Sequence, residues 1–210
     1  MKHLLVAVAL LFGLSGLAHA TEIELKGGPT LVAYDGDIST GVGGSLFLGG
    51  EVDAEKGIGA ELELALVKAD VLSPFGGSTK IAEIESKSVF LNITKKIDSP
   101  SWFGDKVSAD AKVGLGAIFP DVNSAISGVN FDGEPSPAVQ TGLSGEWLIH
   151  QGEGGEAGYE QFNISLVGSA TYVWNDLNIN ADMGGPTTRI KNVDGDHGKV
   201  FVGLKAFKKI

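Results

Sequence analysis

Apolar and polar residues alternate with a period of two along most of the chain. Between positions 107 and 119 every second residue is apolar, while the alternate positions from 108 to 116 are small or charged. The segments 58–66 and 162–174 show similar alternation. Side chains of a β-strand point alternately to opposite faces, so the pattern predicts strands with one apolar face and one small or polar face. In no segment does the spacing of a helix fit the apolar residues better.

This pattern predicts about eight strands, separated by residues that favour turns. They cover residues 22–34, 41–53, 57–72, 79–97, 106–119, 138–150, 158–175 and 198–210. Six of the seven prolines fall in the predicted connections, as expected because proline removes a hydrogen bond from a sheet. Pro29 is the exception, and it predicts a bulge in the first strand or a later start. The two longest connections, 120–137 and 176–197, are both odd-numbered and would lie at the same end of an up-and-down barrel.

The first twenty residues have the organisation of a secretory signal peptide. A basic start at Lys2 is followed by an uncharged apolar run from Leu4 to Ala18 and by the small-x-small sequence Ala18-His19-Ala20. This run is shorter than the roughly 20 residues that span a bilayer as a helix. We therefore predict export, with residues 1–20 as the signal peptide and residues 21–210 as a single domain.

Composition narrows the class of protein further. The chain has 210 residues, no cysteine and a formal net charge of −10. The lack of cysteine excludes a disulfide scaffold, a zinc ribbon, an iron–sulfur site, a cysteine nucleophile and a lipidated cysteine. The negative charge argues against general nucleic-acid binding, which depends on lysine and arginine. Because no later segment approaches a transmembrane helix, entry into a membrane would require a closed barrel.

Two opposite arrangements of the predicted strands fit the alternation. A soluble barrel or sandwich turns its apolar face inward, whereas a membrane barrel turns that face to lipid and keeps polar groups inside. In a small membrane barrel the charged residues of the polar face would form a structural network in the lumen, where unpaired charges are costly. The predicted lumen network consists of Glu51, Glu61, Glu63, Asp110, Lys112, Glu146 and Lys205.

The hairpin of the third and fourth predicted strands favours the membrane arrangement. From Lys68 onward the apolar face of the third strand turns polar, and the returning strand is polar from Glu83 to Lys87 before it becomes apolar at Val89. Each strand therefore has an apolar half of about ten residues, which is the length that a membrane strand needs. The polar halves would stand above the membrane.

These features together resemble the small outer-membrane β-barrel proteins of Gram-negative bacteria. The resemblance covers almost all of residues 21–210 and is architectural: alternating strands, unequal connections, an export signal and no cysteine. It implies an all-β fold, a closed antiparallel up-and-down transmembrane β-barrel of about eight strands. It also implies location in the outer membrane, contact with its lipid and lipopolysaccharide, and assembly by the barrel-assembly machinery.

Residues that could carry catalysis or bind a metal are few. Two histidines, His150 and His197, follow the signal peptide, and His150 lacks the nearby serine of the barrels that trim lipid A. The segment 192–198 resembles part of a calcium loop, but His197 and Gly203 stand where that loop requires glycine and glutamate. We expect no catalytic residue, cofactor-binding residue, cofactor or metal site.

The leading hypothesis is therefore a small outer-membrane barrel without enzymatic activity or a wide pore, because the side chains of eight strands about fill the lumen. Its role would be structural or in surface interaction, with a surface ligand bound through the outer loops and no nucleic-acid partner. The alternative is a soluble exported barrel or sandwich in the periplasm that binds a small apolar ligand.

Overall fold

The computed structural model describes residues 22–34, 38–72, 79–97, 106–152, 162–182 and 188–209. The predicted signal peptide, residues 1–20, lies outside this part of the chain. The described strands are β1 (Glu22–Tyr34), β2 (Gly41–Asp53), β3 (Ile58–Leu72), β4 (Lys80–Ile97), β5 (Val107–Ser124), β6 (Asn130–Glu134), β7 (Ser136–Gln151), β8 (Phe162–Asp182), β9 (Thr188–Asp194) and β10 (His197–Lys209). Among the described residues, no helix is long and apolar enough to cross a membrane.

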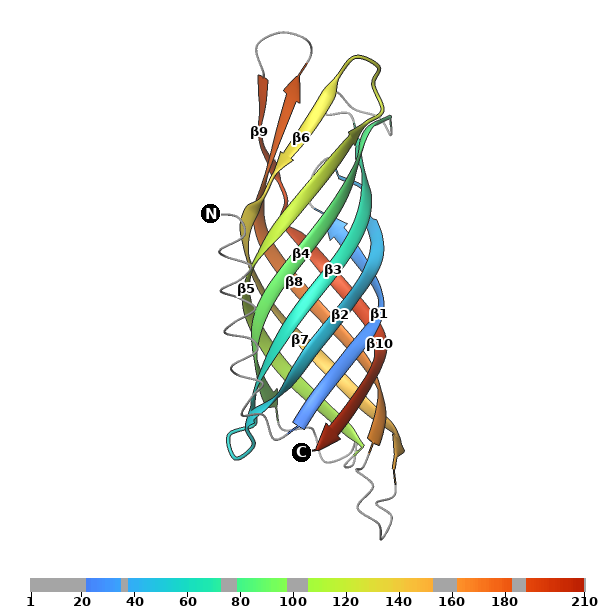
Figure 1. The fold of residues 1–210 in the computed structure, drawn as a ribbon, viewed down its shortest axis with the longest axis vertical. Helices are drawn as coiled ribbons and strands as arrows, with labels where there is room; N and C mark the ends of the chain where they lie inside the picture. The colour runs from blue at the N-terminus through green and yellow to red at the C-terminus, as the bar shows by residue number, and fades with distance from the viewer. Residues whose placement is uncertain are drawn as a thin grey trace.

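Within the described residues, eight of these strands close into an antiparallel barrel (Figure 1). The order is β1, β2, β3, β4, β5, β7, β8 and β10, and β10 pairs with both β8 and β1 to complete the ring. The closed antiparallel barrel of about eight strands that the resemblance implies is thus confirmed. We call the end where β1 begins and β10 ends the lower end, and the end that carries β6 and β9 the upper end, as drawn in Figure 1.

The two long connections differ from their prediction, because both contain strand. β5 continues to Ser124 and β8 to Asp182, and both β6 and β9 pair with the extended part of β8. In this upper extension the apolar rows change face: Val122, Leu177 and Ile179 are buried inside. The segments 120–137 and 176–197 were expected to be loops because the outward apolar row, the signal used to detect strands, stops there.

Pro29 does not delay the start of the first strand. β1 begins at Glu22, and Pro29 pairs with Gly44 of β2. On the other side, the pairing of β1 with β10 runs from Gly27 to Thr30 without including Gly28 or Pro29. A proline has no backbone N–H to donate to a neighbouring strand, which accounts for an interruption at this position.

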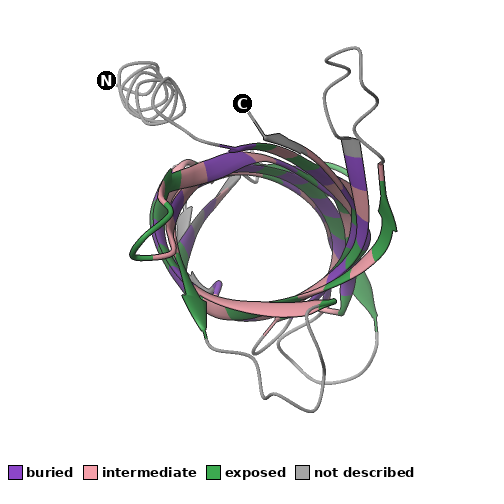
Figure 2. Cartoon of the chain, turned by 90° about the horizontal axis from the view of Figure 1, so that it is seen from below, coloured by how far each residue is buried: buried purple, intermediate pink, exposed green. Residues whose placement is uncertain are grey.

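The apolar rows of the barrel strands face outward and the polar rows face the lumen. Leu115 is 68% exposed and Ile93 is 60% exposed, whereas Glu63, on an inward position, is 0% exposed. Seen along the barrel in Figure 2, buried and exposed positions alternate along the strands of the ring. An inward apolar face, which the soluble alternative requires, is therefore contradicted for the barrel strands. The outer wall has the polarity expected of a surface in contact with lipid.

Charged pairs replace the apolar outer wall near the upper end of β3 and β4. The hairpin pattern predicted polar upper halves on these strands, and the register places Lys68 opposite Glu85, with Lys68 Nζ 2.9 Å from Glu85 Oε2. Lys87 Nζ lies 3.5 Å from the other oxygen of Glu85. The hydrogen bond from Lys68 lowers the pKa of Glu85 and raises the pKa of Lys68. These exposed pairs mark the upper limit of the apolar wall.

Candidate functional site

The lumen of the barrel changes character from its lower to its upper end. We distinguish a lower cavity, which is lined by charged and polar residues, a charged layer above it around Glu61 and Glu63, and an upper apolar cluster around Ile84. Each is built from side chains of several strands, because inward positions of a small barrel converge on its axis.

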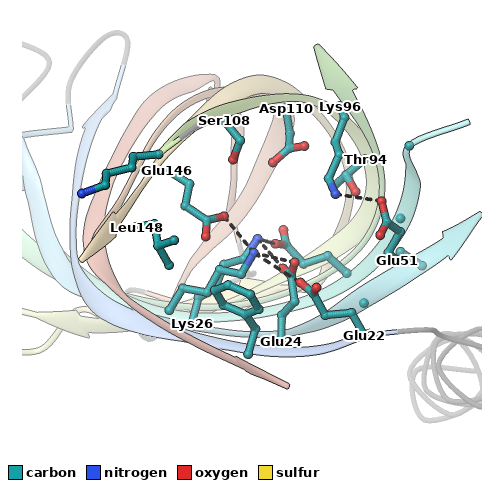
Figure 3. Close-up of a pocket in the computed structure, with 18 residues that line it drawn as sticks. Glu22, Glu24, Lys26, Glu51, Thr94, Lys96, Ser108, Asp110, Glu146 and Leu148 are labelled. Atoms are coloured by element: carbon teal, nitrogen blue, oxygen red, sulfur yellow. Dashed lines mark hydrogen bonds and ion pairs between the residues drawn. The ribbon is translucent and has the colours of Figure 1, made fainter. Parts of the chain in front are cut away.

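The lower cavity has a volume of about 290 Å³ and is lined by residues of every ring strand except β8 (Figure 3). On one side, Lys205 Nζ lies 2.6 Å from Glu24 Oε1 and 2.8 Å from Glu146 Oε2. On another side, Lys96 Nζ lies 2.8 Å from Glu51 Oε1. These ion pairs compensate much of the charge carried by the side chains that face the lumen.

Glu63 is the central carboxylate of the charged layer. Its Oε2 accepts hydrogen bonds from Gln140 Nε2 at 2.9 Å and from Lys112 Nζ at 3.5 Å. Its Oε1 accepts a hydrogen bond from Lys199, whose Nζ also donates to Gln140 Oε1 at 3.0 Å. Strands β3, β5, β7 and β10 are therefore joined across the lumen through one carboxylate.

Glu61 extends this layer toward the lower cavity. Its Oε2 lies 2.8 Å from Lys26 Nζ, and its Oε1 accepts a hydrogen bond from Asn92 Nδ2 at 3.1 Å. Lys26 Nζ in turn lies 3.3 Å from Glu24 Oε2, which links the layer to the ion pairs of the cavity. The charges of the lower lumen thus form a nearly continuous chain of contacts.

Aromatic rings and glycines complete the charged layer. The ammonium of Lys199 lies 5.2 Å from the ring centre of Phe90, an arrangement that favours a cation over an aromatic face. Opposite, Gly114 and Gly116 leave room: an added Cβ would lie 1.9 Å from Asn92 Oδ1 at the first and 2.6 Å from Phe90 Cδ1 at the second. Both glycines are therefore required by the side chains that lean across them.

Above the charged layer, apolar side chains from opposite strands meet inside the barrel. Ile84 of β4 is 0% exposed, and it belongs to a buried cluster with residues of β3, β5, β7 and β8. The members are Ile38, Ala69, Val71, Ala82, Ile84, Phe90, Ile118, Val122, Ala138, Val173, Leu177 and Ile179. This cluster occupies the upper lumen, and nothing in the sequence reasoning anticipated it.

The residues of the predicted lumen network lie in two of these regions. Glu61, Glu63 and Lys112 belong to the charged layer, while Glu146 and Lys205 pair with each other in the lower cavity. Glu51 also lines the cavity but pairs with Lys96. Asp110 lines the cavity too, and within the described residues no ion pair or hydrogen bond joins its side chain to another group.

Sequence reasoning missed five side chains that hold this network together. They are Glu24, Lys26, Asn92, Gln140 and Lys199, and Lys96, the partner of Glu51, was missed as well. Lys26 could have been found, because it continues the inward phase set by Glu22 and Glu24. The neutral Asn92 and Gln140 gave no comparable signal, since polar residues at inward positions are common in such strands.

The two histidines, His150 and His197, lie in different environments. His150 is exposed on β7, whereas His197 is buried and its Nδ1 lies 2.7 Å from the carbonyl oxygen of Gly195. Asp196 Oδ1 accepts a hydrogen bond from the backbone N–H of Asn175 at 2.7 Å. The calcium-like segment 192–198 thus covers the end of β9, the connection through Gly195 and Asp196, and the start of β10.

Comparison with known proteins gives matches among solved structures. No family model and no curated protein matches the chain. The outer membrane protein OprG from Pseudomonas aeruginosa is 14% identical with a TM-score of 0.67, over 91% of this chain and 98% of that chain. A major outer membrane protein from Thermus thermophilus is 13% identical with a TM-score of 0.58, over 88% of this chain and 99% of that chain.

A third similar structure was determined in a lipid bilayer. The outer membrane protein AlkL, solved by solid-state NMR in DMPC bilayers, is 12% identical with a TM-score of 0.55, over 91% of this chain and 92% of that chain. At these identities the likeness concerns the fold. The chain has the closed eight-stranded fold of small outer-membrane barrels.

Proposed function

We propose that this protein is an integral outer-membrane barrel without an open diffusion pore, acting at the cell surface through its upper extension. The observation that carries the proposal is the filled lumen, in which the charged layer around Glu63 lies directly below the apolar cluster around Ile84. An ion or polar solute would have to break buried ion pairs and then cross an apolar constriction.

The polarity of the barrel supports the membrane location. Leu25, Leu143 and Val202 are examples of large apolar side chains about half or more exposed on the outer wall. The rings of Tyr172 and Trp174 pack with their centres 5.0 Å apart and stand on the outer wall of β8. Exposed aromatic residues of this kind are typical of membrane interfaces.

The upper extension supports the role at the surface. β6 and β9 widen the sheet beyond the closed ring, and the buried residues Val122 and Ile179 join this part to the upper apolar cluster. A folded extension presents a fixed surface to lipopolysaccharide or to a surface ligand. Assembly by the barrel-assembly machinery follows from the proposed location, and the proposal includes no catalytic activity and no nucleic-acid partner.

Conductance across a planar lipid bilayer tests the filled lumen. The folded protein should give no steady porin-like conductance, whereas the double variant Ile84→Ala/Phe90→Ala, which removes the apolar contacts above the charged layer, should raise the frequency of openings. Stable open channels from the unaltered protein would contradict the proposal. Release of the mature protein by osmotic shock without detergent would contradict its membrane location.

A further inference from the structure

A groove crosses the outer wall of the barrel over β1, β10 and β8, which are neighbours in the ring (Figure 1). It has a volume of about 680 Å³, and small residues at outward positions, namely Ala33, Ala170 and Gly198, leave it hollow. A Cβ added at Gly198 would have open space within 4 Å. Because Gly198 pairs with both Ala33 and Tyr172, the strands beneath stay joined, and the groove is a hollow of the surface.

The groove follows a row of outward positions that slopes from the polar boundary down into the apolar wall. Strand register joins five of these positions into the row: Lys68, Val42, Leu31, Val200 and Ala170. On β3 the row lies at Lys68, where the apolar wall ends. On β8 it lies at Ala170, below the exposed Trp174 and below Asp176, the first outward charge of that strand. One end of the row is therefore at the boundary and the other is within the apolar wall.

Lys68 is the charged side chain at the upper end of this row. It is 57% exposed, and Glu85 is the only carboxylate within 4 Å of its ammonium among the described residues. Asp70, the next outward position of β3, is paired with Lys80, whose Nζ lies 2.6 Å from Asp70 Oδ1. The exposed Asp121 lies one strand further, opposite Glu85. An anionic group at the upper end of the groove would therefore meet the ammonium of Lys68 before an unpaired carboxylate.

An apolar groove that rises to an exposed ammonium suits a lipid with an acyl chain and a phosphate. In the proposed location the upper part of the wall faces the outer leaflet, whose lipid is lipopolysaccharide, and lipid A carries both groups. We propose that the groove binds one acyl chain of lipid A and that Lys68 binds a phosphate of the same molecule. A groove offers the chain van der Waals contacts that a smooth wall lacks. Such binding requires the proposed location in the outer membrane, but it does not require a closed lumen.

The test is a titration of the folded, ¹⁵N-labelled protein in phosphatidylcholine nanodiscs with lipid A at constant ionic strength, followed by NMR. Saturable shifts of the amide signals of Ala33 and Ala170 are expected. Gly198→Leu fills the groove and should weaken binding by about threefold or more. Lys68→Gln should weaken it by about two- to fivefold, as expected for an exposed charge contact. Gly145→Leu is the matched control, because Gly145 is exposed on β7 outside the groove and has open space at its Cβ, so the affinity should be unchanged.

Native mass spectrometry of the protein isolated from outer membranes in mild detergent identifies the lipid that stays bound. The unaltered protein and Gly145→Leu should retain lipid A, and Gly198→Leu should retain less. Retention of phospholipid in place of lipid A, equal retention by Gly198→Leu, or the absence of saturable shifts in protein that still shows heat-modifiable gel migration would each overturn the proposal. Absence of the protein from the outer-membrane fraction would contradict the proposed location, and lipid A binding with it.

Discussion

Removal of the Glu63 side chain should destabilise the barrel more than any change to an exposed ion pair. Glu63 is 0% exposed and holds the ammonium groups of Lys199 and Lys112 together with the amide of Gln140. In Glu63→Ala, the ammonium of Lys112 still has a carboxylate partner, because its Nζ lies 3.8 Å from Glu61 Oε1. Lys199 loses the only carboxylate that lies within 4 Å of its ammonium among the described residues. A buried ammonium is then left with one amide partner.

The expected decrease in the free energy of unfolding follows from the buried ammonium of Lys199 that is left without a carboxylate. Breaking a buried ion pair by removing one partner costs about 3–5 kcal/mol, because the remaining charge stays buried without compensation. The hydrogen bond from Gln140 adds about 1 kcal/mol. We therefore expect Glu63→Ala to lower the free energy of unfolding by about 4–6 kcal/mol. Glu63→Ala/Lys199→Met should be more stable than the single variant, since it removes the uncompensated charge as well.

Urea unfolding in lipid vesicles, followed by tryptophan fluorescence and by gel migration of unboiled samples, measures these free energies. Asp121→Asn, on the outer wall, is the control and should match the unaltered protein. The reasoning is refuted if Glu63→Ala stays within about 1 kcal/mol of the unaltered protein, the size expected for an exposed pair. It is refuted equally if the double variant is no more stable than Glu63→Ala.

Three other predictions address the outer wall, the lumen glycines and the charged boundary. Leu115→Arg should lower the stability in a bilayer by about 2–4 kcal/mol, because it places a charge in lipid, and an unchanged urea midpoint in vesicles would argue against lipid contact at this position. Gly114→Ala should cost about 1–3 kcal/mol, since its Cβ would lie 1.9 Å from a side-chain oxygen, whereas Gly145→Ala, with open space at its Cβ, should not alter the urea midpoint. The lowered pKa of Glu85 means that its pairing with Lys68 stabilises the fold above the ordinary carboxyl pKa and ceases to do so as pH falls through the lowered value. Lys68→Met should raise the pKa of Glu85 in an NMR titration, and an unmoved pKa would show that Lys68 is not the cause.

The strands of the ring were predictable because an apolar outer wall gives each strand a long, regular signal. β1 and β2 have the predicted bounds, and β3 and β4 each begin one residue later than predicted. A strand that faces lipid must keep an apolar residue at every second position over most of its length. That requirement leaves little freedom in where a strand begins or how its faces are assigned.

The upper extension was not predictable by the same signal. Above Trp174 the outward position of β8 is Asp176, while the apolar residues Leu177 and Ile179 continue on the inward face. The alternation therefore persists, but its phase relative to lipid is reversed. A search for strands by their outward apolar row stops where that row ends, although the strand itself continues to Asp182.

Partners within the lumen depend on strand register, which alternation alone does not supply. Glu63 and Lys112 could be named as inward charges from their own strands. The contacts of Glu63 with Gln140, which is 77 residues away, and with Lys199, which is 136 residues away, require the whole ring to be closed in one register. The individual inward charges were thus accessible from sequence, whereas their pairing was not.

Placing Lys199 and Lys205 on the strand that completes the ring links charge neutrality in the lumen to closure of the barrel. β10 is the last described strand, and it supplies ammonium groups to Glu63, Glu24 and Glu146 at the moment it joins β1 and β8. A chain that lacks β10 has two open sheet edges and a row of uncompensated carboxylates, so it is both adhesive and electrostatically strained. Closing the ring and neutralising its lumen carboxylates are therefore one event, and a ring opened at β10 loses the hydrogen bonds of two strand pairs and the lumen cations together.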